Sequence, residues 1–256
     1  MKPIKFNTEN VQAILRTDSP KTQTRRIMKP QPSQNWTPYS FGEVHKIENG
    51  EFPLCNGLPV VIGYGYSNRD GDEAHISRYQ VGDILYVREK WFDLCSVCIH
   101  NQDEYPDVLC SCMFECEPLL YKACDENRFD GKWKSPATMP KEAARIFLRV
   151  TDVRAERIQD IRDHDAIAEG AMFTDFGTYI PKGMISIDGG KTYHQFNENQ
   201  YAGWSMESQF CPTQCHGTAR GAFSEYWGKV YGKGAWERND WVWVYTFERC
   251  EKPKGD

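Results

Sequence analysis

The sequence predicts an α+β fold, in which a small β-barrel is flanked by helices and interrupted by long irregular insertions. Two observations support this. Short segments of alternating apolar residues are mixed with a few amphipathic helical segments, without the regular strand–helix alternation of parallel sheets. Long stretches rich in Pro, Gly and polar residues separate these elements. With 256 residues, the chain is long enough for a sizeable core, and we expect one domain over residues 1–250 and a loose tail over 251–256.

The N-terminal segment predicts a strand followed by a helix. The strand covers residues 4–6, and Asn7 or Thr8 can cap the helix that follows. The apolar residues of this helix share one face, namely Val11, Ile14 and Leu15. Residues 18–20 end the helix, because they include Asp, Ser and Pro.

Three strands are predicted in the middle of the chain. A Gly-Asp turn at 82–83 precedes a strand over 84–89. Further strands are expected at 119–123 and 143–153. A short helix follows at 161–171.

The C-terminal segment predicts a helix and a central strand. Thr218 can cap a helix whose apolar residues recur at i, i+3 and i+4, and Gly232 or Gly234 ends it. Residues 241–248 alternate strictly, yet both sets are largely apolar or aromatic. Such a strand is typical of the centre of a sheet that is covered on both faces.

The three expected insertions cover residues 31–79, 92–118 and 172–217. The net charge of −5 argues against a broad duplex binder, since such binding needs many cations on phosphates. A narrow site for one nucleotide or a short single strand remains compatible with it. The N-terminus lacks an apolar signal core and no run is long enough to span a membrane, so we expect a soluble, cytoplasmic protein without a membrane partner.

Residues 21–26 combine three cations with three hydrogen-bonding side chains: Lys21, Thr22, Gln23, Thr24, Arg25 and Arg26. This composition suits a site for a phosphate or a nucleobase. It also suits a nucleophilic lysine, if burial and the neighbouring arginines lower the pKa of Lys21. Two plainer interpretations stay open: a static clamp for phosphate or carboxylate, and a solvated helix end.

A second group of candidate ligand-binding residues ends the strand at 84–89. Arg88, Glu89 and Trp91 lie where barrel loops often form sites. Trp91 can stack on a base, a contact that contributes about 1–3 kcal/mol. The alternative is a core tryptophan next to a structural Arg88–Glu89 ion pair.

Ten cysteines are present, and in a reducing compartment disulfides are not expected. Cys95 and Cys98 form a Cys-x-x-Cys pair, and Cys110 and Cys112 form a second close pair, as in a tetrahedral structural zinc site. Other candidate zinc ligands are Cys116, Cys211, Cys215 and His216. The alternative is a set of scattered loop thiols.

Taken in order, several segments resemble the ASCH domain of the PUA-like superfamily. They are Lys21–Arg26, the turn and strand 82–91, Ala-Ile-Ala-Glu-Gly at 166–170, the last helix, and Trp-Val-Trp-Val-Tyr at 241–245. The pattern is most similar to ASCH proteins encoded by phages and prophages of enteric bacteria. The resemblance implies a small barrel flanked by helices, with a cleft for RNA or a modified nucleoside.

One small bacterial member of that family is a 4-acetylcytidine amidohydrolase. Its proposed catalytic set is a Lys and a Thr of a K-T-x-T motif and a Glu of the short central helix. The resemblance places these roles on Lys21, Thr24 and Glu169. Lys21 would then attack an amide carbonyl, Thr24 would assist, and Glu169 would carry the proton.

Three functions are therefore expected as alternatives. The first is binding of RNA or a modified nucleobase or nucleoside, with Lys21, Thr24, Arg25 and Arg26 as polar contacts and Trp91 as the stacking partner. The second is a hydrolase that removes an acyl group from the exocyclic amine of cytidine. The third is a phage-encoded interaction factor that binds a host or phage protein through its insertions.

Overall fold

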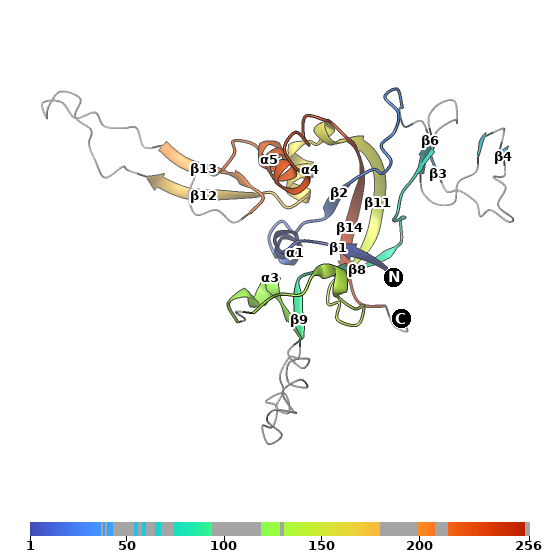
Figure 1. The fold of residues 1–256 in the computed structure, drawn as a ribbon. Helices are drawn as coiled ribbons and strands as arrows, with labels where there is room; N and C mark the ends of the chain where they lie inside the picture. The colour runs from blue at the N-terminus through green and yellow to red at the C-terminus, as the bar shows by residue number, and fades with distance from the viewer. Residues whose placement is uncertain are drawn as a thin grey trace, which may run out of the picture.

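The fold is α+β, as predicted, and its centre is a five-stranded sheet (Figure 1). The computed structural model describes residues 1–36, 38, 40–42, 54–55, 58–59, 65–67, 74–93, 119–128, 131–179, 199–207 and 215–253. The α-helices are α1 (Thr8–Leu15), α3 (Lys122–Asp125), α4 (Asp163–Ala168) and α5 (Ala219–Tyr231). Short 3-10 helices are η2 (Glu126–Arg128), η3 (Pro136–Thr138) and η4 (Ile158–Asp160).

The five strands of the main sheet are β1 (Lys2–Lys5), β2 (Gln23–Ile27), β8 (Ile84–Arg88), β11 (Phe147–Arg157) and β14 (Trp241–Cys250). Their order is β1-β8-β11-β14-β2, with β1 parallel to β8 and the other pairs antiparallel. Among the described residues, no ladder joins the edge strands β1 and β2. The sheet is thus shown, and the closed barrel stays a prediction.

The remaining strands form small two- and three-stranded sheets. They are β3 (Ser40–Gly42), β4 (Leu54–Cys55), β5 (Leu58–Pro59), β6 (Gly65–Ser67), β7 (Ala74–Ile76), β9 (Trp91–Asp93), β10 (Leu119–Tyr121), β12 (Met172–Tyr179) and β13 (Asn199–Ser205). Strands β12 and β13 pair and project away from the main sheet (Figure 1).

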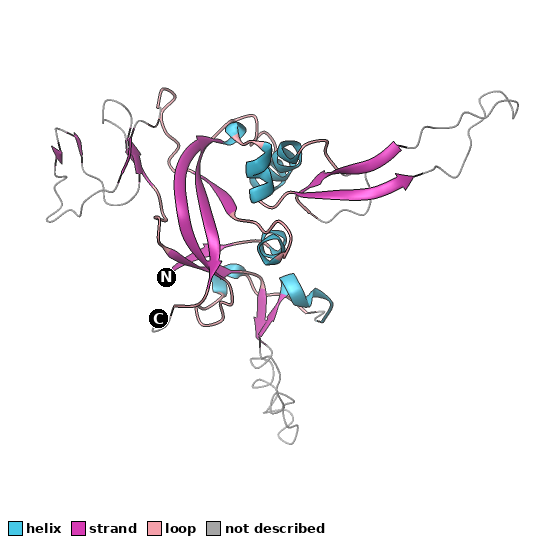
Figure 2. Ribbon diagram, turned by 180° about the vertical axis from the view of Figure 1, so that it is seen from behind, coloured by secondary structure: helices cyan, strands magenta, loops and turns pink. Residues whose placement is uncertain are grey.

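Strand β14 is covered on both faces, as its two apolar sets predict. Trp243, Tyr245 and Phe247 belong to one buried cluster, which also contains Val11 and Ile14 of α1. Val242 and Val244 belong to a second cluster, which contains Ala166 of α4 together with Ala222, Phe223 and Trp227 of α5. Figure 2 shows α4 and α5 lying together beside the sheet. The two cores therefore lie on opposite faces of β14.

Several segments differ from the prediction, and three of them bear on the site. The basic segment after α1 forms the edge strand β2, because its residues 23–27 pair with β14. The strand expected at 119–123 ends at Tyr121, and the next residues turn into α3. Part of the insertion expected at 172–217 is the regular β12–β13 pair. The N-terminal helix, its Asn7 cap and the Thr218 cap of α5 are confirmed.

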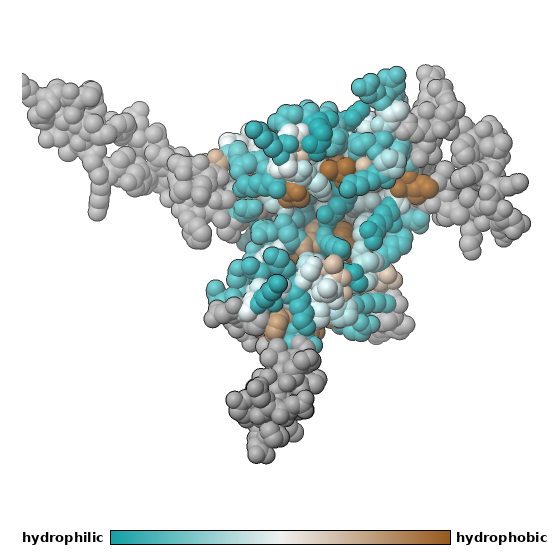
Figure 3. Space-filling model, viewed as in Figure 1, coloured by the Kyte–Doolittle hydropathy of each residue, from teal (hydrophilic) through white to brown (hydrophobic). Residues whose placement is uncertain are grey.

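The described surface is mainly polar on the face shown in Figure 3, where apolar residues appear only as small separate patches. Within the described part of the chain, every helix is too short or too polar to cross a bilayer.

Candidate functional site

Strand β2 presents two different sets of side chains on its two faces. Cross-strand partners share a face, and successive residues point to opposite faces. Thr24 pairs with Tyr245, and Arg26 pairs with Trp243, on the face of the α1-containing core. Arg25 pairs with Val244, on the face covered by α4 and α5. The two adjacent arginines of the basic motif, Arg25 and Arg26, therefore lie in different surroundings.

Lys21 is held in place by main-chain hydrogen bonds before β2 begins. Its amide N–H donates to the carbonyl oxygen of Ala13 in α1, at 2.9 Å. The next amide, of Thr22, donates to the carbonyl of Ala168 at the end of α4, at 2.8 Å. Lys21 is thereby fixed between the C-terminal ends of two helices, opposite the residue that follows α4.

That residue is Glu169, and it accepts three charge-assisted hydrogen bonds, two on its carboxylate and one on its main-chain oxygen. Lys21 Nζ lies 2.6 Å from Glu169 Oε2 and also donates to the Glu169 main-chain oxygen at 2.6 Å. Arg25 Nη1 donates to Glu169 Oε1 at 3.2 Å. Lys21 and Glu169 are each 3% exposed and Arg25 is 2% exposed. Lys21 and Glu169, which the family resemblance places in one catalytic set, are therefore in direct contact.

Gly170 allows this close packing. Its φ of 107° lies in the region that favours glycine, and an added Cβ would lie 2.9 Å from Ala13 Cβ and 3.6 Å from Lys21 Cβ. A larger residue would push α1 away from the turn that carries Glu169. The Glu-Gly pair is thus a local requirement of the contact between α1 and α4.

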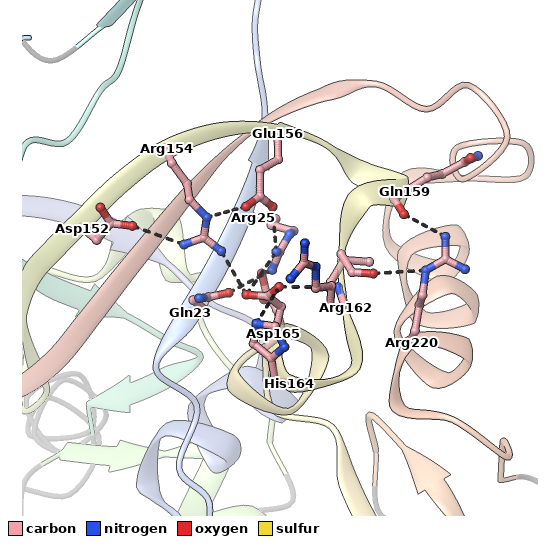
Figure 4. Close-up of polar contacts among 12 residues, drawn as sticks. Gln23, Arg25, Asp152, Arg154, Glu156, Gln159, Arg162, His164, Asp165 and Arg220 are labelled. Atoms are coloured by element: carbon pink, nitrogen blue, oxygen red, sulfur yellow. Dashed lines mark hydrogen bonds and ion pairs between the residues drawn. The ribbon is translucent and has the colours of Figure 1, made fainter. Parts of the chain in front are cut away.

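Arg25 connects Glu169 to further charges. Its Nη2 lies 3.0 Å from Glu156 Oε2 and 3.8 Å from Asp165 Oδ1 (Figure 4). Arg154, two residues before Glu156 on β11, contacts both of these carboxylates. Burial alone would raise the pKa of Asp165, but Arg25 and the other donors around it lower that pKa below its ordinary value. The charges of this cluster are thus matched by opposite partners.

Burial lowers the pKa of Lys21 to about 8, although Glu169 acts in the opposite direction by its charge and its hydrogen bond. A lowered pKa makes a lysine more nucleophilic at neutral pH. However, the Lys21 side chain is only 1% exposed and that of Glu169 only 4%. In this conformation the described residues enclose the pair.

The hollow next to the basic motif lies on the other face of β2. It has a volume of about 590 Å³, within the range of ligand sites. Its cationic lining residues are Lys5, Arg26, Lys29, Arg78 and Arg88, and its aromatic ones are Tyr79, Trp243 and Tyr245. We call this hollow the cationic cavity. Arg26 Nη2 donates to the carbonyl of Lys5 at 2.7 Å, so it links the edge strands β1 and β2 at the cavity.

The charges of the cationic cavity are unbalanced. Among the described residues, no carboxylate lines it and none of its five cations forms an ion pair. Lys5, Lys29 and Arg78 are exposed, so their side chains are free to move toward a guest. A concave surface with one sign of charge concentrates the field and attracts anions.

Two tyrosines give the cavity neutral, polar aromatic walls. Burial raises the pKa of Tyr245 to about 12, and it also raises the pKa of Tyr79. Both hydroxyls therefore remain protonated at neutral pH. The Tyr79 hydroxyl donates to the carbonyl of Pro3 at 2.7 Å, and the Tyr245 oxygen lies 3.0 Å from Ser77 Oγ. These bonds hold the rings in fixed positions.

The structure separates the other predicted residues. Thr24 is buried on the face opposite Arg25. Arg88 lines the cationic cavity together with Arg26. Glu89 is 1% exposed and forms a bidentate pair with Arg145, at 3.0 Å on both oxygens, in place of the Arg88–Glu89 pair considered from the sequence.

Trp91 is 7% exposed and does not line the cationic cavity. It borders another hollow, and the Nζ of Lys134 lies 4.9 Å from its ring centroid. The ring face that would stack on a base thus already has a cation beside it.

The predicted zinc ligands Cys95, Cys98, Cys110, Cys112, Cys116 and Cys211 lie outside the described residues. Of the two that are described, His216 contacts Glu225, with 2.5 Å between Nε2 and Oε2, and Cys215 is half-buried. Within the described ranges, no group of three or more His, Cys, Asp or Glu residues is arranged to hold a metal ion. Zinc stays a prediction.

Sequence reasoning missed most of the cavity lining. Arg78 and Tyr79 fell in a segment expected to be an insertion, and Trp243 and Tyr245 were expected to be core residues. The pairing of Arg26 with Trp243 is the feature that brings them together, and strand register is not visible in a single sequence. A signal was nevertheless present, because one face of the last strand is aromatic throughout.

Comparison of the chain with protein-family models, with curated proteins and with solved structures found no match.

Proposed function

We propose that the protein binds RNA or a modified nucleotide, with the cationic cavity as its site. The observation that carries this proposal is the lining of the cavity: unpaired cations surround aromatic walls, and no carboxylate is among them. A nucleotide presents the complementary features, an anionic phosphate and a flat base. Arginine and lysine bind phosphate, and aromatic rings stack on bases.

The same proposal includes the PUA-like ASCH fold. Its support is the α+β architecture, the order of the segments that resemble the family, and the contact of Arg26 with Lys5 between the two edge strands. That contact brings β1 and β2 together, as a barrel requires. The barrel and the family membership are proposals at this point.

The test is a titration with uridine 5′-monophosphate and with short single-stranded RNA at two salt concentrations. The double variant Lys29→Ala, Arg78→Ala removes two exposed cations whose side chains form no hydrogen bond within the described part of the chain. We expect its affinity to fall about tenfold or more, since bonds to charged groups contribute about 1.5–3 kcal/mol. The matched control is Lys233→Ala, which removes an exposed lysine remote from both the motif and the cavity lining.

Two results would reject binding at this site. One is the absence of saturable binding by either ligand at low salt. The other is an equal affinity of the double variant and the wild type. Binding that ignores salt would also count against it, because contacts with phosphates release counterions and weaken as salt rises.

An amidohydrolase is a second candidate, and the lowered pKa of Lys21 beside Glu169 favours it. The enclosed pair would need to open before an acylated cytidine could reach Lys21 Nζ. Release of cytidine from 4-acetylcytidine, followed over time, tests this function. Turnover that disappears in Lys21→Met supports it, and turnover absent in the wild type rejects it.

Zinc bound by Cys95, Cys98, Cys110 and Cys112 is proposed as a staple of the 92–118 insertion. Its support is the spacing of these thiols. Metal analysis before and after chelation tests it, and substoichiometric zinc with unchanged stability would refute it. A host or phage protein partner for the insertions also stays a prediction.

A further inference from the structure

A second hollow lies beside the end of β8. It has a volume of about 700 Å³ and is lined by Lys90, Trp91, residues 132–136 and Thr138. We call it the lysine–tryptophan groove. Its lining alternates between cations and indoles along the chain, with Lys90 before Trp91 and Trp133 between Lys132 and Lys134. No carboxylate is among the lining residues that the structure describes.

The groove offers two kinds of contact. Lys90 and Lys132 are exposed, and neither forms an ion pair in the described part of the chain. Trp133 is half-buried, so part of the residue is accessible to solvent. Trp91 is buried, with 7% of its surface exposed. Trp133 is therefore the more exposed of the two indoles in the groove.

Arg88 connects this groove with the cationic cavity. It lines the cavity, and its Nη1 donates to the carbonyl of Ala137 at 3.4 Å. The neighbours of Ala137 in the chain, Pro136 and Thr138, line the groove. Lys90 follows Arg88 by two residues, a distance of about 7 Å along an extended chain. Arg88 therefore lies between residues that line the two hollows.

From this continuity we infer that the protein binds an extended single strand of RNA, which runs from the cationic cavity past Arg88 into the lysine–tryptophan groove. This inference rests on the proposed function. A mononucleotide would occupy the cavity alone and leave the groove empty. A single strand repeats a phosphate and a base at every step, and this repeat matches a path that alternates cations with aromatic rings. An acidic peptide would match the charges and would leave the indole without a flat partner.

The test compares an oligouridylate of about eight nucleotides, within the range of single-strand sites, with uridine 5′-monophosphate. The variant Lys90→Ala, Lys132→Ala removes the two exposed lysines of the groove. We expect it to weaken oligonucleotide binding and to reduce the slope of log affinity against log salt by about 0.7 for each phosphate that is no longer neutralised. Affinity for the mononucleotide should stay unchanged. The matched control is again Lys233→Ala.

The variant Trp133→Ala provides a second test of the extended path. Loss of one base stack should weaken oligonucleotide binding about 5- to 150-fold, and Trp133→Phe should restore most of it. Circular dichroism confirms folding of each variant. A DNA oligonucleotide of the same sequence separates recognition of RNA from recognition of any single strand, and equal affinity for DNA would overturn the assignment to RNA.

The outcomes separate the two proposals. If the mononucleotide binds and the oligonucleotide binds no better, or if the groove variants bind it like the wild type, the extended path is wrong and the cavity site stands. If neither ligand binds, the proposed function itself fails, and the extended path fails with it.

Discussion

Cationic side chains on the two faces of β2 lie in opposite surroundings. On the face toward α4 and α5, Arg25 is buried and donates a hydrogen bond to Glu169. Lys21, which precedes the strand, is also buried and donates to the same carboxylate. On the other face, Arg26 lines a cavity together with four more cations that lack carboxylate partners within the described ranges. One short basic segment thus supplies both a closed charge cluster and an open cationic surface.

This difference indicates which charges are structural and which are available for a ligand. Removing a buried cation from water is unfavourable unless a partner compensates for it, so the cations at Glu169 are committed to each other. Unpaired cations around a hollow repel one another, and an anion relieves that repulsion. The comparison therefore indicates a structural role for one face and supports the proposed binding role of the other.

The largest expected effect is on stability. Glu169→Ala leaves Lys21 and Arg25 buried without their shared carboxylate. We expect the free energy of unfolding to fall by about 3–5 kcal/mol, the usual range when one partner of a buried ion pair is removed. Denaturant unfolding followed by circular dichroism measures it.

Glu248→Gln is the matched control, because Glu248 forms an exposed pair with Arg149 at 3.9 Å. Exposed pairs contribute about 0–1 kcal/mol. Equal losses in Glu169→Ala and Glu248→Gln would show that the Glu169 cluster is not a structural unit.

The next effect compares the two neighbouring arginines. Arg26→Met should weaken binding of uridine 5′-monophosphate about tenfold or more, since a charged contact contributes about 1.5–3 kcal/mol. Arg25→Met should mainly reduce stability, because it leaves carboxylates of the buried cluster without a cation. Titration of both variants, with denaturant unfolding in parallel, checks this. Equal loss of affinity in both would contradict the assignment of the two faces.

The smallest effect, measured per pH unit, is a dependence of stability on pH. The pKa of Lys21 is about 8 in the folded protein, against 10.5 as its ordinary value, so between these values the unfolded state binds more protons. Stability should therefore rise with pH in this window, by up to about 1.4 kcal/mol per pH unit. Lys21→Met should lack this rise. Unfolding measured from pH 7.5 to 10.5 checks it, and parallel curves for the two proteins would contradict the lowered pKa.

The sequence predicted the regular elements better than the site. Periodicity and caps located α1, α5 and β14, because each has apolar residues that repeat with the period of its structure. Periodicity and caps did not link Lys21 with Glu169. Only the family resemblance placed these two residues in one catalytic set. Thr24 shows which information the sequence lacked. The face of the sheet on which Thr24 lies is decided by its pairing with Tyr245, and Tyr245 belongs to a strand more than two hundred residues away.

The cavity was not predictable for a related physical reason. Its walls come from β1, β2, β8 and β14 and from the residues after β7, and the packing of these elements depends on long-range contacts. Local patterns placed Arg26 and Arg88 among the candidates, because Arg26 belongs to the basic motif at 21–26 and Arg88 lies at the end of a predicted strand. Lys5, Lys29 and Arg78 had no local signal, since isolated surface cations are common.

The most direct test is a calorimetric titration of uridine 5′-monophosphate into two variants, Lys21→Met and Arg78→Ala, at low salt and neutral pH. Because Lys21 is enclosed by Glu169 and Arg78 lines the cationic cavity, we predict wild-type affinity for folded Lys21→Met and a clear loss for Arg78→Ala. Loss of affinity in Lys21→Met together with wild-type affinity in Arg78→Ala would contradict the assignment of binding to the cavity.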